Sequence, residues 1–339
     1  MAQSEGQGGR FRNGGTQLVR HHLLGEDLRA SSGGDEAAAG GEAGQTQAPL
    51  VGGKTPTERL QRVLDQRVSQ QVLGEYMSGR VPEAFAALSP EDQARFAQLL
   101  RDQNGNGYAQ AYLLRGLAAS NSVDDLEWLS GQLEGKSGAW MRNNATLIGH
   151  DPLTQQFSDS CVPTVSQALR GELDPVYALR QRQAGDVHKY DGYDPERYNP
   201  SVAQEQSTLL ANGGGIPVGR EELGGLGLDV EPFRDVVNQG AQNAGLSYDW
   251  AETPNGEDAA RILDSNLARG IPTPLAIVSA DSGHAVLGVD SRVRRGQTEY
   301  QVYDPWYGKL HWVPRDAVVN DTVDIGTGQP EVLLAFPAR

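Results

Sequence analysis

The sequence is nearly free of cysteine: Cys161 is the only one in 339 residues. A single cysteine excludes an intrachain disulfide and any metal site built from several thiolates. Long apolar runs are missing too, since no stretch approaches the ~18 residues that a membrane helix needs. The N-terminus has no apolar segment followed by a small-residue cleavage site, so no signal peptide is recognisable. We therefore expect a chain that is made in the cytoplasm and has no membrane span.

Basic residues are scarce, with 29 Lys and Arg against 44 Asp and Glu and a net charge of −15. Nucleic-acid binding depends on clustered Lys and Arg, so this balance argues against a nucleic-acid partner. Aromatic residues are rare in the first part of the chain, where Gly, Ala, Ser, Gln and Glu dominate. Such a composition buries too little apolar surface to offset the entropy of ordering. We predict a disordered leader over residues 1–54.

Helix-start signals appear directly after this leader. Thr55, Pro56 and Glu58 form a capping box at the start of "TPTERLQRVLDQRVSQQVL", which is expected to be one helix. The stretch "SPEDQARFAQLL" repeats the signal, and further helical patterns follow near 109–119 and 122–133. Residues 55–142 are therefore predicted to form an all-helical module.

The segment "DQNGNG" lies between two of these helices and resembles the first half of a calcium-binding loop, with Asp102, Asn104 and Asn106 at the ligand spacing. The closing acidic residue is missing, because the twelfth position is Leu113. An ordinary Asn/Gly turn is the favoured interpretation. We expect neither a metal nor a cofactor.

Residues 143–339 mix helices with β-rich runs. Helices are predicted from Cys161 to Gly171 and over 201–211, 231–244 and 257–270. Strands are predicted over 271–280, 284–290, 298–304, 309–313 and 331–336. This order indicates an α+β fold in which a helix comes first and an antiparallel sheet follows.

Cys161 stands at the start of a predicted helix, after the N-cap residue types Asp159 and Ser160. A lone cysteine is most often a small buried apolar residue. A helix N-terminus, however, favours the thiolate, which is the form that attacks carbonyl carbons. The position therefore makes Cys161 a candidate nucleophile.

A thiolate needs a partner base, and that base needs a group to orient it. Of the six histidines, His284 alone opens an alternating strand directly after a turn. If 284–290 and 298–304 pair symmetrically around the loop "SRVRRGQ", Asp290 faces Thr298 and His284 faces Asp304. Taken singly, His284 is more often a structural sheet residue and Asp304 a turn acid. Together with Cys161 they predict a Cys–His–Asp triad.

Gln155 and Gln156 precede the cysteine by six and five residues. A loop of that length can bring one amide beside the thiol, where it would stabilise a developing oxyanion. We take Gln155 as the candidate oxyanion donor and Gln156 as the alternative.

The pattern Q-x5-C-x-P-T, followed by "GHAVLGVD" and "YDP", resembles the papain-like cysteine peptidases of the C39-like, bacteriocin-processing type over residues ~150–320. The resemblance implies a papain-like fold with Cys161 as nucleophile, His284 as general base, Asp304 as orienter and Gln155 in the oxyanion hole. One residue departs from the family. Val162 stands where those enzymes usually carry glycine, and we expect it to narrow the cleft or alter substrate choice.

The resemblance implies a thiol hydrolase that cleaves a peptide or amide bond in a protein or peptide substrate. A catalytic domain of this kind behind a leader and a helical module also resembles bacterial effectors and toxins delivered into other cells, which implies a delivery or immunity partner. Deamidation or transglutamination would use the same triad, and a non-catalytic peptide-binding module remains a further alternative. The 55–142 helices either form a separate docking module or complete the core of the enzyme.

Overall fold

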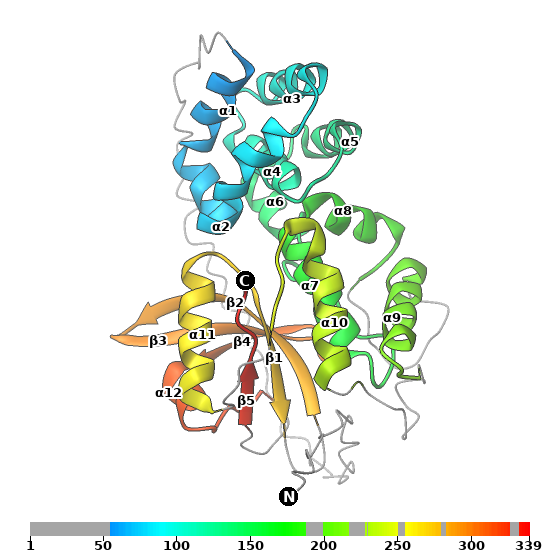
Figure 1. Cartoon of the computed structure of the whole chain (residues 1–339), viewed down its shortest axis with the longest axis vertical. Coiled ribbons are helices and arrows are strands. Elements are labelled where there is room, and N and C mark those ends of the chain that lie inside the picture. The colour runs from blue at the N-terminus through cyan, green and yellow to red at the C-terminus, as the bar shows by residue number, and fades with distance from the viewer. Residues whose placement is uncertain are drawn as a thin grey trace, which may run out of the picture.

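The computed structural model describes residues 55–187, 199–216, 228, 230–249, 255–278, 283–325 and 332–339. The fold is α+β, as predicted, and a helix-rich region precedes an antiparallel sheet. In Figure 1 the first six helices form one end of the molecule, and the sheet with its flanking helices forms the other. The predicted leader over 1–54 and the histidine at 188 lie outside the described residues.

Two of the first six helices begin at the caps predicted for them. Thr55 and Glu58 make the capping box, and Ser89 accepts a hydrogen bond from the Asp92 N–H. Their bounds are α1 Pro56–Leu64, α2 Arg67–Ala86, α3 Pro90–Asp102, α4 Gly107–Ala118, α5 Val123–Leu133 and α6 Gly138–Asn144.

The expected single helix after Thr55 is in fact two helices, because α1 ends at Leu64 and α2 starts at Arg67. A kink at Gly74, where φ is +65°, then interrupts α2. A Cβ added at Gly74 would lie 3.0 Å from the Gly270 Cα, so glycine allows this close approach. The Tyr76 N–H bonds the Arg269 carbonyl, outside its own helix.

The "DQNGNG" segment is a helix-connecting turn. Asn106 caps α4 by accepting from the Ala109 N–H, and Leu113 is fully buried in the core. Both roles are structural. Across the described ranges, His, Cys, Asp and Glu side chains form no group of three or more placed to hold a metal ion.

The helices beside and after the candidate cysteine are α7 Cys161–Leu173, α8 Pro175–Ala184, α9 Pro200–Asn212, α10 Val230–Ala241 and α11 Gly256–Ala268. The predicted stop of α7 at Gly171 is wrong by two residues. Gly171 serves packing instead, since a Cβ there would lie 2.6 Å from the Leu147 Cγ. None of the helices in the described ranges is long and apolar enough to cross a membrane.

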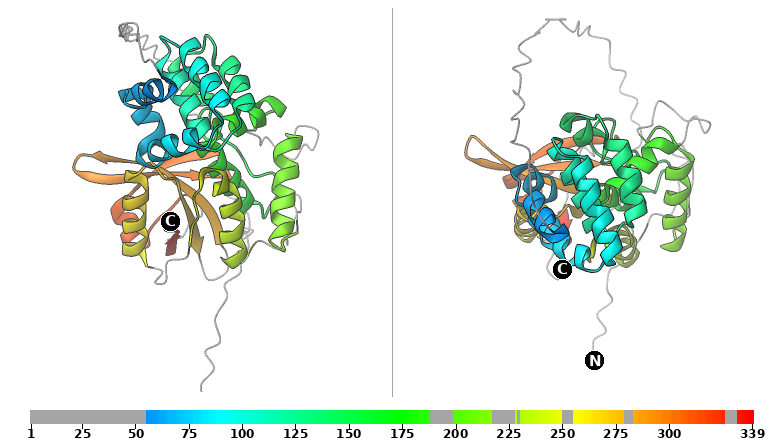
Figure 2. Two further views of the ribbon diagram at one scale, coloured as in Figure 1. Left: turned by 45° about the horizontal axis from the view of Figure 1, so that its top comes forward. Right: turned by 90° about the horizontal axis from the view of Figure 1, so that it is seen from above.

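The sheet has the order β4-β3-β2-β1-β5, and all of its neighbouring strands are antiparallel. The strands are β1 Thr273–Val278, β2 Gly283–Arg294, β3 Gln297–Asp304, β4 Lys309–Pro314 and β5 Val332–Ala335, with α12 Arg315–Val319 between the last two. Figure 2 shows the hairpin of β2 and β3 extending beyond the rest of the sheet.

The predicted register of this hairpin is wrong. The turn is only Arg295 and Gly296, both with positive φ, because strand pairing continues through the segment expected to be a loop. Asp290 therefore pairs with Gln301 instead of Thr298. A β-bulge interrupts the pairing between Gly288 and Asp290.

Both faces of the sheet are covered. Ala285, Leu287 and Tyr303 belong to the main hydrophobic core, which includes α7 and α10, whereas Val286 and Val302 belong to a second core that includes α11. The main core is continuous from Leu60 in α1 to Phe336 after β5. The helix-rich region and the sheet region thus share one apolar interior.

Candidate active site

Cys161 is the first residue of α7, as the cap pattern predicted. Its exposure is only 4 %, and it belongs to the main hydrophobic core. Burial of this kind fits an inert apolar cysteine as well as a nucleophile. The side chains around Cys161 therefore decide between these two interpretations.

His284 and Asp304 form a close ion pair inside the protein. The His284 Nε2 lies 2.8 Å from the Asp304 Oδ1, and the two side chains are 12 % and 2 % exposed. The same carboxylate oxygen accepts the Trp306 N–H at 2.8 Å. This second bond fixes the carboxylate in the turn that follows β3.

The third member of the group is Cys161, whose side chain lies close enough to His284 to raise the pKa of the imidazole. Since Nε2 faces Asp304, the other ring nitrogen, Nδ1, is the one left for the sulfur. Burial lowers the pKa of the imidazole, but the hydrogen-bonding and charge effects of Asp304 and Cys161 outweigh it and raise the pKa to about 10. The raised pKa favours the imidazolium form of His284, which lies beside the Asp304 carboxylate and the Cys161 side chain.

Two hydrogen bonds tie the loop before Cys161 to the end of β3. The Gln155 N–H donates to the Pro305 carbonyl at 2.9 Å. The Tyr303 hydroxyl donates to the Leu153 carbonyl. These bonds join chain segments about 150 residues apart in sequence, as the Tyr303–Leu153 separation shows, and bring the thiol and the His–Asp pair together.

The amides of the two candidate oxyanion residues are bonded to nearby backbone. The Gln155 Nε2 donates to the carbonyls of Phe157 and Ser158 at 2.9 and 3.0 Å. The Gln156 Nε2 donates to the Thr154 carbonyl at 2.9 Å. Both amides shape the turn that leads into α7, and an oxyanion role for either stays a prediction.

Val162 lies fully buried in the main hydrophobic core. Its side chain therefore contributes to packing under the start of α7. The expected narrowing of a cleft by this side chain finds no support in that position.

The other described histidines stand apart from this group. His150 is exposed and contacts Asp151, and His311 lies in β4. One residue close to the candidate site could not be predicted from the sequence. Gln206, in α9, is fully buried and bonds the segment that leads to Cys161. A glutamine inside a helical pattern looks like any surface residue, and only the tertiary contact distinguishes it.

No model of a known protein family matches this chain, and no curated protein matches it either.

Proposed function

We propose that this protein is a cysteine hydrolase of papain-like fold, which cleaves a peptide or related amide bond through an acyl-enzyme on Cys161. The observation that carries the proposal is the group of Cys161, His284 and Asp304, in which the carboxylate bonds the imidazole at 2.8 Å and the cysteine at the start of α7 raises its pKa. A structural cysteine in an apolar core gains nothing from an imidazolium neighbour, because burying a charged pair costs free energy. A nucleophile needs that neighbour.

In the proposed reaction each side chain has one role. The Cys161 thiolate attacks the substrate carbonyl carbon, and the His284 imidazolium gives its proton to the leaving amine nitrogen as the C–N bond breaks. Water then attacks the thioester and gives a proton to His284, which releases the acid and restores the thiolate. Asp304 orients the ring and stabilises its positive charge throughout.

Labelling with iodoacetamide tests the proposal, because Cys161 is the only thiol and the mass of the whole chain reports its modification. An inert thiol that is 4 % exposed should react more slowly than the same thiol in the unfolded chain. We expect the folded protein to react faster than the chain in denaturant near neutral pH, and His284→Ala to abolish the difference. Slower labelling of the folded chain would favour a non-catalytic binding module.

A further inference from the structure

Every hydrogen-bonding group of the Gln206 amide bonds either the segment before Cys161 or α7. Its Oε1 accepts the Gln156 N–H at 2.7 Å and the Ser160 hydroxyl at 3.0 Å. Its Nε2 donates to the Thr154 carbonyl at 3.3 Å and to the Gln167 Oε1 at 3.0 Å. A glutamine amide has two donors and an oxygen with two lone pairs, so these four bonds satisfy it completely.

The orientation of this amide is fixed by its backbone partners. The Gln156 N–H can only donate and the Thr154 carbonyl can only accept, so exchanging the oxygen and nitrogen of Gln206 would lose both bonds. Gln206 is 0 % exposed, and lost bonds at a buried site are not replaced by water. The amide therefore holds residues 154–160 in one arrangement.

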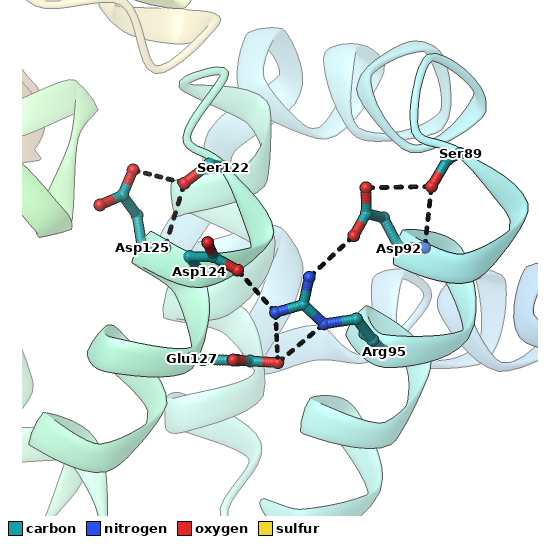
Figure 3. Close-up of polar contacts among 7 residues, drawn as sticks. All are labelled: Ser89, Asp92, Arg95, Ser122, Asp124, Asp125 and Glu127. Carbon is teal, nitrogen blue, oxygen red and sulfur yellow. Dashed lines mark hydrogen bonds and ion pairs between the residues drawn. The ribbon is translucent and has the colours of Figure 1, made fainter.

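The bond to Ser160 bears on how α7 begins. Three other described helices follow a serine, and there the hydroxyl accepts the N–H three residues ahead: Ser89 from Asp92, Ser122 from Asp125 and Ser137 from Trp140. Figure 3 shows the first two of these caps.

At α7 the serine does not cap the helix. Ser160 makes no side-chain cap bond, and the residue three positions ahead is Pro163, which has no N–H. The Ser160 hydroxyl instead donates to the Gln206 Oε1 and accepts the Phe157 N–H. The start of α7, where Cys161 lies, is thus left without a side-chain cap.

We propose that Gln206 is a positioning residue for the reaction at Cys161, which fixes residues 154–160 so that the thiol meets His284 at an uncapped helix start. The inference rests on the proposed function. It assigns no chemical step to Gln206, which acts through Ser160 and the backbone of Gln156. An uncapped first turn keeps its N–H groups and its positive dipole end available to negative charge on the sulfur or the substrate oxygen.

The test uses the full chain and the rate of Cys161 alkylation by iodoacetamide. Gln206→Leu removes all four bonds at similar volume. Gln204→Leu is the matched control, because Gln204 is exposed on the same helix and its amide bonds Thr208, one turn ahead. We expect the Gln206 variant to react about tenfold more slowly, as a displaced nucleophile should, and the Gln204 variant to match the unaltered chain.

A double-mutant cycle with His284→Ala separates positioning from general loosening of the structure. If Gln206 acts by placing the thiol against His284, Gln206→Leu should have no further effect once His284 is gone. Slowing by the same factor in both backgrounds would overturn the inference, as would equal rates for the two leucine variants. If His284→Ala alone leaves the rate unchanged, the proposed function itself fails and the inference falls with it.

Ser160→Ala covers the case in which Gln206→Leu does not fold. It removes the hydroxyl held by Gln206 and leaves the other three amide bonds in place. We expect slower alkylation in this variant, with a cooperative melt retained. An unchanged rate would show that the hold on Ser160 does not matter to the thiol.

Discussion

His284 and Asp304 meet diagonally across the β2–β3 hairpin, although neither stands directly opposite the other. The last paired residues are Leu287 and Tyr303, so continuing the register places Asp304 opposite Val286, two residues from His284. An offset of two keeps both side chains on the same face of the sheet. The bulge between Gly288 and Asp290 puts the two side chains on the same face. Without its extra residue, Asp304 would oppose Leu287 and face away from His284.

The contact predicts different results for the two partners. In Asp304→Asn the amide oxygen can still accept from His284 and Trp306, but the negative charge is lost. We expect alkylation of Cys161 to slow by about tenfold, the difference between a charged and a neutral hydrogen bond. His284→Ala removes the ring itself, and a loss of about 100-fold or more should follow. Equal rates for the two variants would contradict the assigned roles.

Cys161→Ala should abolish activity and leave the fold intact. The change removes a single buried sulfur atom, which costs about 1 kcal/mol by analogy with the loss of one buried methylene. In a chain of this size such a loss lowers Tm by about 2–4 °C, which scanning calorimetry can measure. A much larger fall would mean that the sulfur serves mainly to pack the core, as an inert cysteine would.

The charge state of His284 predicts a pH dependence. Hydrogen bonds and charges from Asp304 and Cys161 raise the pKa of His284 from 6.5 to about 10 against the effect of burial. A raised folded-state pKa stabilises the fold fully below pH 6.5, and this contribution disappears as the pH rises through about 10. NMR titration of the ring should place its midpoint well above that of an ordinary histidine.

The same titration has internal controls. Cys161→Ala and Asp304→Asn each remove one group that raises the pKa of His284, so the titration midpoint should fall in both variants. Thermal melts between pH 6.5 and 10 should also lose less stability in His284→Ala than in the unaltered chain. A titration midpoint that stays unchanged in both variants would show that the His284 ring does not interact with the two groups.

Local signals in the sequence predicted most helices and strands because caps, periodicity and turn residues act over a few positions. The starts of α1, α3 and α7 and the pairing of β2 with β3 are examples. Three features escaped prediction because their causes are tertiary. The kink at Gly74 depends on Gly270, the packing role of Gly171 on Leu147, and the role of Gln206 on a loop 50 residues away.

In the candidate site, too, one part could be predicted from the sequence and another could not. Symmetric pairing of the two strands predicted that His284 and Asp304 would come together, and the structure places the His284 Nε2 2.8 Å from the Asp304 Oδ1. The hairpin register used to reach that prediction was wrong by three residues near the turn, because strand pairing continues to Arg295 and Gly296, and the bulge near Gly288 then reduces the error at Asp304 to two. A two-residue error preserves the face, whereas an error of one residue would have separated the pair.

The contacts of the helix-rich region predict the behaviour of a chain that begins at Asn143. Tyr76 donates its hydroxyl to the Ala244 carbonyl at 2.9 Å and its N–H to the Arg269 carbonyl at 3.0 Å. The main hydrophobic core also crosses this boundary without a break. Truncation would expose that core and leave both carbonyls without their partners, at a cost that a marginally stable fold cannot absorb. We therefore expect the shortened chain to lose its cooperative thermal transition and to aggregate. A soluble fragment that melts cooperatively and alkylates at Cys161 as fast as the full chain would instead show that residues 55–142 form a separate module.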